Sequence, residues 1–256
     1  MVWKQRTELM LGKTAVERLE KASVLVVGLG GVGGIAAEMI CRAGVGNMTI
    51  VDCDTVNETN INRQIIALHS TLYRPKAEVL AQRLLDINPN LKLVVKNKLL
   101  ESENTEKLLN ENEFDFVVDA IDTLSPKVFL IKSCIERGIK IVSSMGAGAK
   151  IDPTKIKIAD ISETEYCALA KSVRQRLGKF GIKKGLPVVF STESAKKEAV
   201  VETDEQYKKS ITGTISYMPN VFGCFLAAYV VREISSPSKP PHKGGFQTSE
   251  GLKAKN

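Results

Sequence analysis

The stretch Ala22-Ser-Val-Leu-Val-Val-Gly-Leu-Gly-Gly-Val-Gly33 decides the fold class that this sequence predicts. Its first six residues form an apolar run typical of a buried strand, and residues 32–43 follow with a helical pattern. Gly28, Gly30 and Gly33 have the G-x-G-x-x-G spacing, and Gly31 adds a fourth glycine. Glycine-rich turns also serve tight packing. A strand, a glycine loop and a helix in this order nevertheless favour a nucleotide site, where backbone N–H groups at the helix N-terminus approach a phosphate.

Strand-like and helix-like runs alternate along the first 150 residues. Further strands are predicted at 48–52, 91–95, 115–119 and 139–144, and further helices at 75–87 and 125–137. Continuous apolar strands separated by helices predict an α/β, Rossmann-like fold, with a mostly parallel sheet and helices on both faces. A smaller, irregular C-terminal part follows, with strands near Ile156 and Val188 and a basic helix between them.

The same pattern divides the chain into one domain and a tail. Residues 1–234 form the domain, with a nucleotide-binding part at 20–150, a substrate or crossover region at 151–215 and a C-terminal helix at 217–234. Residues 235–256 hold proline, serine, lysine and glycine with almost no apolar side chains, which predicts a disordered tail.

Composition limits the classes of protein to which the chain can belong. Of its 256 residues 43% are hydrophobic and 25% charged, close to the average of soluble globular proteins. The formal net charge of +7 suggests an anionic partner such as nucleic acid or phosphates. Five cysteines argue against a disulfide framework and the first residues show no secretory signal, so we expect a cytoplasmic protein. The apolar run 218–231 is shorter than the roughly 20 residues that a bilayer requires, so we expect a buried helix there.

Charged residues lie where the predicted strands end. Asp52 ends the second strand about twenty residues after the glycine loop, where a carboxylate can accept hydrogen bonds from ribose hydroxyls. Arg63 and Lys76 can neutralise a polyphosphate, and Asp122 can hold Mg2+ together with phosphate oxygens. Parallel strands present their carboxyl ends at one edge of a sheet, so we expect these groups to converge there. Each charge alone is typical of an ordinary surface, but the set favours ATP.

A nicotinamide-dependent oxidoreductase is the alternative from another class, because the same glycine spacing occurs in NAD-binding proteins. Such an enzyme needs little beyond Asp52 except a nicotinamide pocket, whereas this chain carries further candidates for phosphate and metal binding. The spacing G-x-x-x-x-G-K-[ST] does not occur in the sequence, which excludes a P-loop enzyme. We therefore expect ATP binding and no useful affinity for NAD.

The run Leu25–Gln64, taken with Lys76 and Asp122, resembles the adenylating domain of the ubiquitin-activating-enzyme-like superfamily, the HesA/MoeB/ThiF group. This superfamily includes the sulfur-carrier adenylyltransferases of molybdopterin and thiamine biosynthesis. Its members activate a carboxylate by forming an acyl-AMP with ATP. The resemblance therefore implies carboxylate adenylation.

The resemblance also implies a role for each candidate residue. Asn60, Arg63 and Lys76 correspond to phosphate contacts, and Asp122 corresponds to the Mg2+ ligand. Arg6 corresponds to an arginine that reaches the phosphates of a neighbouring subunit, which implies a homodimer and adds Arg6 to the catalytic residues. The implied nucleotide-binding set is Gly28, Gly30, Gly31, Gly33, Asp52, Asn60, Arg63, Lys76 and Asp122.

The cysteines depart from the pattern of the carrier-activating members. Those relatives often hold a structural zinc with two C-x-x-C pairs, whereas the nearest cysteines here, Cys41 and Cys53, are too far apart, so we expect no zinc site. Ubiquitin-activating relatives use a catalytic cysteine after the fifth strand, and Cys167 is the sole candidate in that region. Its acidic neighbours Glu163 and Glu165 disfavour a thiolate, so we expect no nucleophilic role for it.

The second half of the chain narrows the resemblance. The segments 143–160, 168–178, 187–193 and 213–223 resemble the bacterial tRNA threonylcarbamoyladenosine dehydratases. These enzymes use ATP to cyclise N6-threonylcarbamoyladenosine beside the anticodon, with an attacking group that belongs to the substrate, so no catalytic cysteine is needed. The alternative is an adenylyltransferase that activates the C-terminus of a ubiquitin-like or sulfur-carrier protein. A monovalent cation and a sulfur-transfer protein stay open as further partners, and no DNA partner is expected.

A run of basic residues with no acid among them begins at Lys171, and we expect it to contact the tRNA backbone. An ordinary solvated helix face is the alternative for so short a stretch. The expected contacts are Lys171, Arg174, Arg176, Lys179, Lys183 and Lys184.

Overall fold

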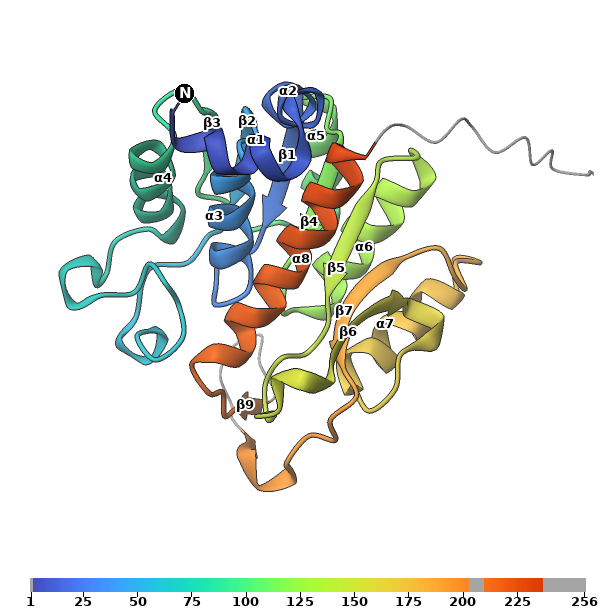
Figure 1. Ribbon diagram of the computed structural model, residues 1–256. Coiled ribbons are helices and arrows are strands. Elements are labelled where there is room, and N and C mark those ends of the chain that lie inside the picture. The colour runs from blue at the N-terminus through green and yellow to red at the C-terminus, as the bar shows by residue number, and fades with distance from the viewer. Residues whose placement is uncertain (1, 203–209, 237–256) are drawn as a thin grey trace, which may run out of the picture.

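The computed structural model describes residues 2–202 and 210–236, and a seven-stranded sheet forms its centre (Figure 1). The strand order is β3-β2-β1-β4-β5-β7-β6, and every neighbouring pair is parallel except β7 and β6. The short strands β8 and β9 pair separately. The strands are β1 (Ser23–Val27), β2 (Asn47–Val51), β3 (Lys92–Lys96), β4 (Phe116–Asp119), β5 (Ile141–Ser144), β6 (Ile156–Asp160), β7 (Pro187–Ser191), β8 (Val200–Glu202) and β9 (Ser210–Thr212).

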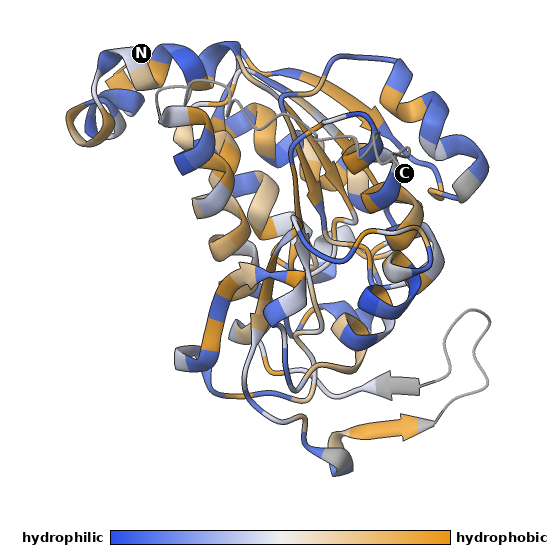
Figure 2. Ribbon diagram, turned by 90° about the vertical axis from the view of Figure 1, so that its right-hand side faces the viewer, coloured by the Kyte–Doolittle hydropathy of each residue, from blue (hydrophilic) through white to orange (hydrophobic). Residues whose placement is uncertain are grey.

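Helices cover both faces of the sheet, because alternate residues of a strand point to opposite faces. Val24 and Val26 of β1 join the core that α2, α3, α4 and α8 cover, whereas Leu25 and Val27 join the core that α5, α6 and α7 cover. Figure 2 shows the hydrophobic strands at the centre of the molecule. The helices are α1 (Gln5–Leu11), α2 (Lys13–Lys21), α3 (Gly33–Ala43), α4 (Lys76–Ile87), α5 (Ser102–Asn110), α6 (Leu124–Glu136), α7 (Ala168–Gly178) and α8 (Tyr217–Ser235), with 3-10 turns η1 (Val2–Lys4), η2 (Glu58–Asn60), η3 (His69–Thr71), η4 (Pro153–Lys155), η5 (Ile161–Glu163) and η6 (Lys197–Ala199).

The long helix α8 packs against α3 and brings the C-terminal part of the chain to the glycine loop. Gly223 makes this approach feasible, since a Cβ there would lie only 2.4 Å from the carbonyl oxygen of Val32. Met218, Phe222 and Leu226 of α8 are buried, as expected for the apolar run 218–231. Among the helices that the structure describes, none has the length and hydrophobicity needed to cross a membrane.

The predicted fold class is confirmed, and each predicted strand of the parallel sheet is present. Three helices, α1, α2 and α5, lie outside the predicted elements because their short apolar faces are surrounded by charged residues. The strand near Ile156 is an antiparallel edge strand, β6, beside β7. Ser235 is the last residue of α8, and residues 237–256 of the predicted tail lie outside the described residues.

Candidate nucleotide-binding site

The glycine loop joins the end of β1 to the start of α3, and its glycines meet different neighbours. Gly28 has φ +85°, and a Cβ there would lie 2.7 Å from the carbonyl oxygen of Ala120, just after β4. A Cβ at Gly33 would lie 1.7 Å from the carbonyl oxygen of Gly28. By contrast, the nearest atom to a Cβ at Gly30 is the side-chain nitrogen of Gln64, at 3.7 Å. Packing therefore requires glycine at 28 and 33, whereas the space beside Gly30 is free for a ligand to approach the backbone.

Asp52, directly after β2, connects this strand to the glycine loop. Its carboxylate accepts the backbone N–H of Leu29 at 2.6 Å and that of Asp54 at 2.8 Å. Burial raises the pKa of the Asp52 carboxyl, while the Lys76 charge and the two N–H donors act in the opposite direction. The predicted ribose carboxylate thus lies beside the loop, and it also holds the loop in shape.

Lys76 is the first residue of α4 and points back to the end of β2. Its side chain is buried, and its Nζ lies 2.7 Å from the Asp54 carboxylate, which is itself largely exposed. The backbone N–H of Lys76 also donates to the carbonyl oxygen of Asp54, at 2.9 Å. Asp52, Cys53 and Asp54 form the one close group of metal-ligating side chains found among the described residues. The buried ammonium group of Lys76 and the carboxylates of Asp52 and Asp54 therefore lie next to the glycine loop.

Arg63 and Asp122 come from different loops and interact electrostatically. Burial lowers the pKa of the Arg63 guanidinium, and the charge of Asp122 acts in the opposite direction. The guanidinium donates to the carbonyl oxygen of Thr59 and to the side-chain oxygen of Asn62, both at 2.8 Å. The buried side-chain oxygen of Asn60 accepts the N–H of Asn57 in a capping box of η2. The segment after β2 and the turn after β4 thus meet at the carboxyl edge of the sheet.

A buried ion pair lies beneath the turn that carries Asp122, and neither of its two residues was predicted for the site. Nζ of Lys127 lies 2.6 Å from the Asp119 carboxylate, and both side chains are completely buried. Asp119 also accepts hydrogen bonds from the Ser143 hydroxyl, at 2.5 Å, and from the N–H of Ile121, at 3.1 Å. The pair therefore holds the turn that carries Asp122. The signal for this ion pair in the sequence was Lys127, which interrupts the apolar pattern of residues 124–136.

The start of α8 is a second feature that the sequence argument did not assign to the site. Asn220 donates to the carbonyl oxygen of Arg63 at 3.1 Å, and Asn62 donates to that of Thr214 at 2.9 Å. Oδ1 of Asn220 and Oε1 of Gln64 are the buried side-chain atoms that lack a hydrogen-bond partner in the described part of the chain. In general, a buried polar atom without a partner destabilises the folded state by about 1–3 kcal/mol. Gln64 follows Arg63 in the chain and Asn220 bonds to it, so both unpartnered oxygens belong to neighbours of Arg63.

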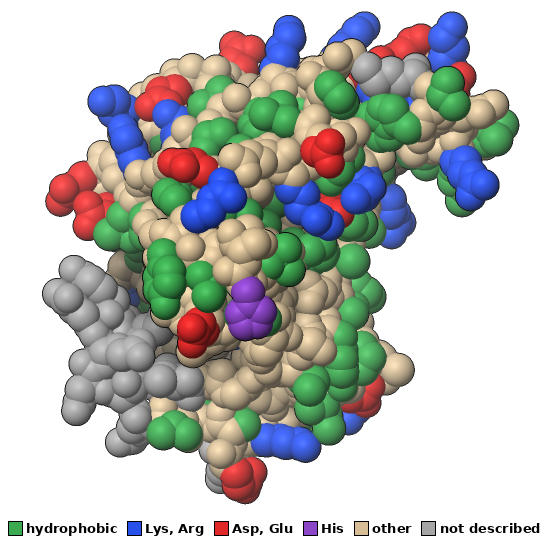
Figure 3. All heavy atoms as spheres, turned by 90° about the vertical axis from the view of Figure 1, so that its left-hand side faces the viewer, with side chains coloured by type: hydrophobic (Ala, Val, Ile, Leu, Met, Phe, Trp, Pro, Cys, Tyr) green, Lys and Arg blue, Asp and Glu red, His purple; other side chains and the backbone are tan. Residues whose placement is uncertain are grey.

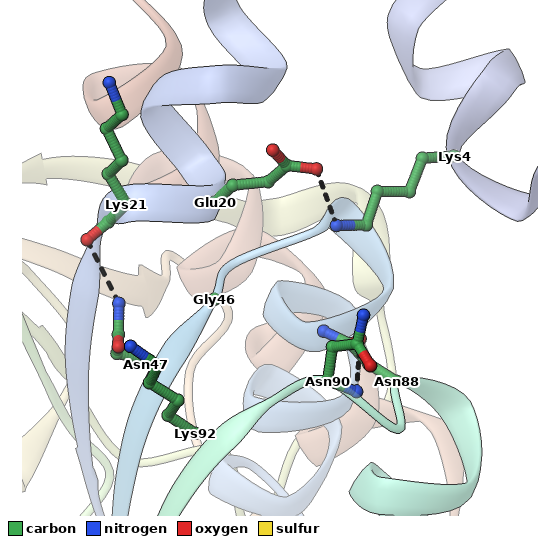
Figure 4. Close-up of a pocket in the computed structure, with 8 residues that line it drawn as sticks. All are labelled: Lys4, Glu20, Lys21, Gly46, Asn47, Asn88, Asn90 and Lys92. Carbon is green, nitrogen blue, oxygen red and sulfur yellow. Dashed lines mark hydrogen bonds and ion pairs between the residues drawn. The ribbon is translucent and has the colours of Figure 1, made fainter. Parts of the chain in front are cut away.

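The N-terminal segment lies at the opposite edge of the sheet. Lys4, just before α1, forms an ion pair with Glu20 at 2.9 Å, and its stem lies beside Gly44 at the end of α3. Arg6 is exposed on α1. A hollow of about 630 Å3 at this edge is lined by Lys4, Glu20, Lys21, Gly46, Asn47, Asn88, Asn90 and Lys92 (Figure 4). Arg6 is therefore not brought to the glycine loop of its own chain.

The basic residues of α7 and of the segment after it have two kinds of surroundings. The guanidinium of Arg174 is half-buried and donates to the carbonyl oxygen of Thr164 at 2.8 Å and to its hydroxyl. Arg176 donates to the hydroxyl of Ser125 at 2.8 Å but is exposed, as are Lys171, Lys179, Lys183 and Lys184. A hollow of about 480 Å3 between the start of α6 and α7 is lined by Leu124, Ser172, Gln175, Arg176 and Lys179.

Cys167 caps the N-terminus of α7, where its Sγ accepts the N–H of Ala170 at 3.5 Å. The nearby Lys150 is buried, which lowers its pKa, and it donates to the carbonyl oxygens of Ser191, at 3.0 Å, and Glu193, at 2.5 Å. Cys167 therefore caps a helix, and Lys150 binds the backbone at the end of β7 and just after it.

Residues 4–255 match the ThiF family. This chain belongs to the ThiF family. The superfamily identified from the glycine loop, Lys76 and Asp122 is thereby confirmed. Within the ThiF family, the chain is 41% identical over 239 residues to the tRNA threonylcarbamoyladenosine dehydratase of Bacillus subtilis, covering 90% of this chain and 93% of the relative.

A solved structure with a similar sequence agrees with the fold. The Escherichia coli tRNA N6-threonylcarbamoyladenosine dehydratase in complex with ATP matches with a TM-score of 0.83 and 34% identity, over 91% of this chain and 95% of that chain. The molybdopterin-synthase adenylyltransferase of Escherichia coli is 35% identical over 151 residues, which are 59% of each chain. The similarity to these two dehydratases therefore covers about nine-tenths of this chain, and the similarity to this adenylyltransferase covers 59% of it.

Proposed function

We propose that this ThiF-family protein is an ATP-dependent tRNA threonylcarbamoyladenosine dehydratase. It would cyclise N6-threonylcarbamoyladenosine in tRNA after activating the threonine carboxylate with ATP. The observation that carries the proposal is the match along nearly the whole chain to the Bacillus subtilis dehydratase, at 41% identity over 93% of that relative. The ATP complex of the Escherichia coli enzyme supports ATP as the activating nucleotide.

The charges beside the glycine loop suit carboxylate adenylation. A carboxylate that attacks the α-phosphate of ATP must overcome repulsion from the phosphate oxygens, and fixed cations offset this charge as it develops. In our proposal Arg63 and Lys76 supply these cations, Asn60 adds a phosphate contact, and Asp52 accepts from the ribose. The carboxylate is already ionised, so this step needs no protein base. The attack expels pyrophosphate and leaves an acyl-AMP. A nitrogen or oxygen of the same substrate's carbamoyl group then attacks the activated carbonyl, AMP leaves with one former carboxylate oxygen, and the proton of the attacking group passes to solvent.

Mg2+ fits the donor set at this edge of the sheet. Carboxylate oxygens combined with phosphate oxygens are the ligands that Mg2+ prefers, and the charge of Asp122 acts directly on Arg63. We propose Asp122 as the protein ligand. When bound, the ion would neutralise phosphate charge.

A second copy of the chain completes the proposed site. The exposed Arg6 lies at the opposite edge of the sheet from the glycine loop of its own chain, so in our proposal it acts at the site of a partner. Figures 2 and 3 show the N-terminal helices projecting from the body of the molecule. Val2, Leu9 and Met10 are 88%, 82% and 83% exposed there, and such an apolar surface suits contact with another copy. We propose a homodimer in which Arg6 reaches the phosphates bound by the partner.

The tRNA is proposed to contact the exposed basic residues of α7 and the segment after it. The hollow between α6 and α7 begins at Leu124, two residues after Asp122, so this surface adjoins the proposed ATP site. The half-buried Arg174 is left out of the proposed contacts, because its guanidinium is already bonded to Thr164. The proposed contacts are Lys171, Arg176, Lys179, Lys183 and Lys184. A tRNA substrate is consistent with a cytoplasmic enzyme.

The decisive experiment incubates purified protein with ATP, Mg2+ and tRNA that carries N6-threonylcarbamoyladenosine, followed by mass spectrometry of the nucleosides. We expect loss of one water from that nucleoside and release of AMP, with Arg63→Ala as the inactive control. Adenylation of a sulfur-carrier or ubiquitin-like C-terminus, with an unchanged nucleoside, would favour the adenylyltransferase alternative. Binding of NAD without ATP would contradict both functions.

A further inference from the structure

The start of α8 holds the segment that carries Arg63 from two sides. Asn220 donates its amide to the carbonyl oxygen of Arg63 at 3.1 Å, and to that of Ser216 at 2.5 Å. One residue earlier in the segment, Asn62 donates to the carbonyl oxygen of Thr214 at 2.9 Å, and it accepts from the Arg63 guanidinium at 2.8 Å. Both the main chain and the side chain of Arg63 are therefore tied to residues 214–220.

The glycine loop takes part in the same junction. A Cβ at Gly31 would lie 3.0 Å from the Cβ of Pro219 and 3.3 Å from the carbonyl oxygen of Arg63. The first turn of α8 thus packs on the glycine loop while its asparagine bonds to the Arg63 segment. A shift of this turn would move the two parts of the proposed phosphate site relative to each other.

The amide at position 220 is satisfied on its donor side only. Oδ1 of Asn220 is buried without a partner, which disfavours the folded state, whereas the amide nitrogen donates to two carbonyl oxygens. The amide contributes two N–H donors, and one of them donates to the carbonyl oxygen of Arg63. The bond thus connects residues 157 positions apart in the chain.

We infer that Asn220 is a positioning residue, which sets where the Arg63 guanidinium lies relative to the glycine loop. This inference rests on the proposed function, in which Arg63 contacts the phosphates of ATP. Asn220 acts through Arg63 and touches no substrate. The motif at residues 213–223 is thereby given a role in nucleotide binding.

The test compares Asn220→Ala with Asn47→Ala. Asn47 is a matched control, because its amide likewise donates to two carbonyl oxygens, those of Lys21 and Ala22, both at 3.1 Å, at the far edge of the sheet (Figure 4). ATP affinity is measured by calorimetry and stability by thermal unfolding. We expect Asn220→Ala to raise the Kd for ATP about tenfold, which is 1.4 kcal/mol. Asn47→Ala should lower Tm and leave the Kd for ATP unchanged.

A second variant keeps the test decisive if Asn220→Ala folds poorly. Asn220→Ser retains a hydroxyl that can donate to the Ser216 carbonyl one turn back but does not reach Arg63. It should weaken ATP binding as Asn220→Ala does. Unchanged ATP affinity in a folded Asn220 variant would overturn the inference.

A double-mutant cycle separates this inference from the proposed function. If Asn220 acts through Arg63, Asn220→Ala should not weaken ATP binding further in an Arg63→Ala background. Additive losses would mean that Asn220 acts by another route and would overturn the inference. If Arg63→Ala alone leaves ATP affinity unchanged, the proposed site itself fails and the inference fails with it. A loss for Arg63→Ala with none for Asn220→Ala contradicts only the positioning role.

Discussion

Asp52 is one residue that serves the fold and the proposed chemistry together. Its carboxylate accepts the N–H of Leu29 and so holds the loop that would receive the phosphates, at the position from which a ribose would be bound. The glycines divide these tasks. Gly28 and Gly33 allow close packing of backbone on backbone, whereas Gly30 has no close neighbour on its open side.

Gly30→Ala and Gly33→Ala should therefore separate nucleotide binding from folding. A Cβ at residue 30 makes only an ordinary contact of 3.7 Å with Gln64, so this variant should keep the wild-type Tm within a few degrees. Its methyl group should occupy the space of a phosphate and raise the Kd for ATP at least about tenfold. A Cβ at residue 33 would lie 1.7 Å from a carbonyl oxygen, and this overpacking should cost stability by about 1–3 kcal/mol or more. Thermal unfolding and calorimetry measure both effects, and wild-type ATP affinity in Gly30→Ala would contradict the proposed loop function.

At the scale of elements, a buried carboxylate joins α3 to α4. Glu38 lies 2.8 Å from Arg42 on its own helix and 2.5 Å from Arg83 on α4. Burial by itself would raise the pKa of Glu38, but the hydrogen bonds and charges of Arg83 and Arg42 outweigh it, so the pKa falls below its ordinary value of 4.5. The ionised carboxylate therefore stabilises the folded state above pH 4.5, and this contribution is lost as the pH falls through the lowered pKa.

Glu38→Gln should lower the free energy of unfolding at pH 7 by about 1.5–3 kcal/mol, because hydrogen bonds to a charged group are removed. The difference from wild type should shrink as the pH is lowered below 4.5, which urea unfolding at several pH values will measure. Glu136→Gln is the control, since its partner Lys132 is one turn away on an exposed face and the expected loss is about 0.3–0.5 kcal/mol. A constant difference down to acid pH would show that the charge of Glu38 is not the stabilising feature.

The second prediction at this scale concerns the basic segment that follows α7. Replacement of Lys179 and Lys183 by alanine should reduce the salt dependence of tRNA binding, because fewer counterions are released when fewer phosphates are neutralised. The slope should change by roughly 0.7–0.9 for each phosphate that the protein no longer neutralises. Lys98→Ala combined with Lys107→Ala removes the same charge from exposed positions elsewhere and should leave the slope unchanged. Filter binding at two or more salt concentrations measures it. Equal slopes for both double variants would mean that the basic run is an ordinary solvated face.

At the scale of the whole molecule, the proposed homodimer places Arg6 of one copy at the ATP site of the other. If each site combines Arg6 of one copy with Arg63 of the other, Arg6→Ala and Arg63→Ala should each be inactive alone. Mixing and exchanging equal amounts should restore about a quarter of wild-type activity, because half of the dimers then contain one intact site. Absence of complementation after demonstrated subunit exchange would place Arg6 outside the partner's site.

The sequence by itself determined the fold class, the glycine loop and the set of charges after β2 and β4. These features depend on short-range patterns: apolar runs of strand length, the spacing of glycines, and the rule that parallel strands end at one edge. Asp52, Lys76 and Asp122 could be placed at this edge without coordinates for that reason.

Only the tertiary structure decided which groups contact one another across long separations in the chain. In the sequence, Asp119 is an ordinary carboxylate at the end of a strand and Lys127 is an ordinary lysine in a helix. In the structure, the packing of α6 on β4 buries them as an ion pair. From the sequence, Arg174 is expected to be a surface charge, whereas in the structure its guanidinium donates to Thr164, which follows η5. Asn220 meets Arg63 because α8 packs on α3, and no local pattern encodes a contact between residues 157 apart. Such contacts depend on how whole layers pack, which is a property of the assembled core and not of any segment within it.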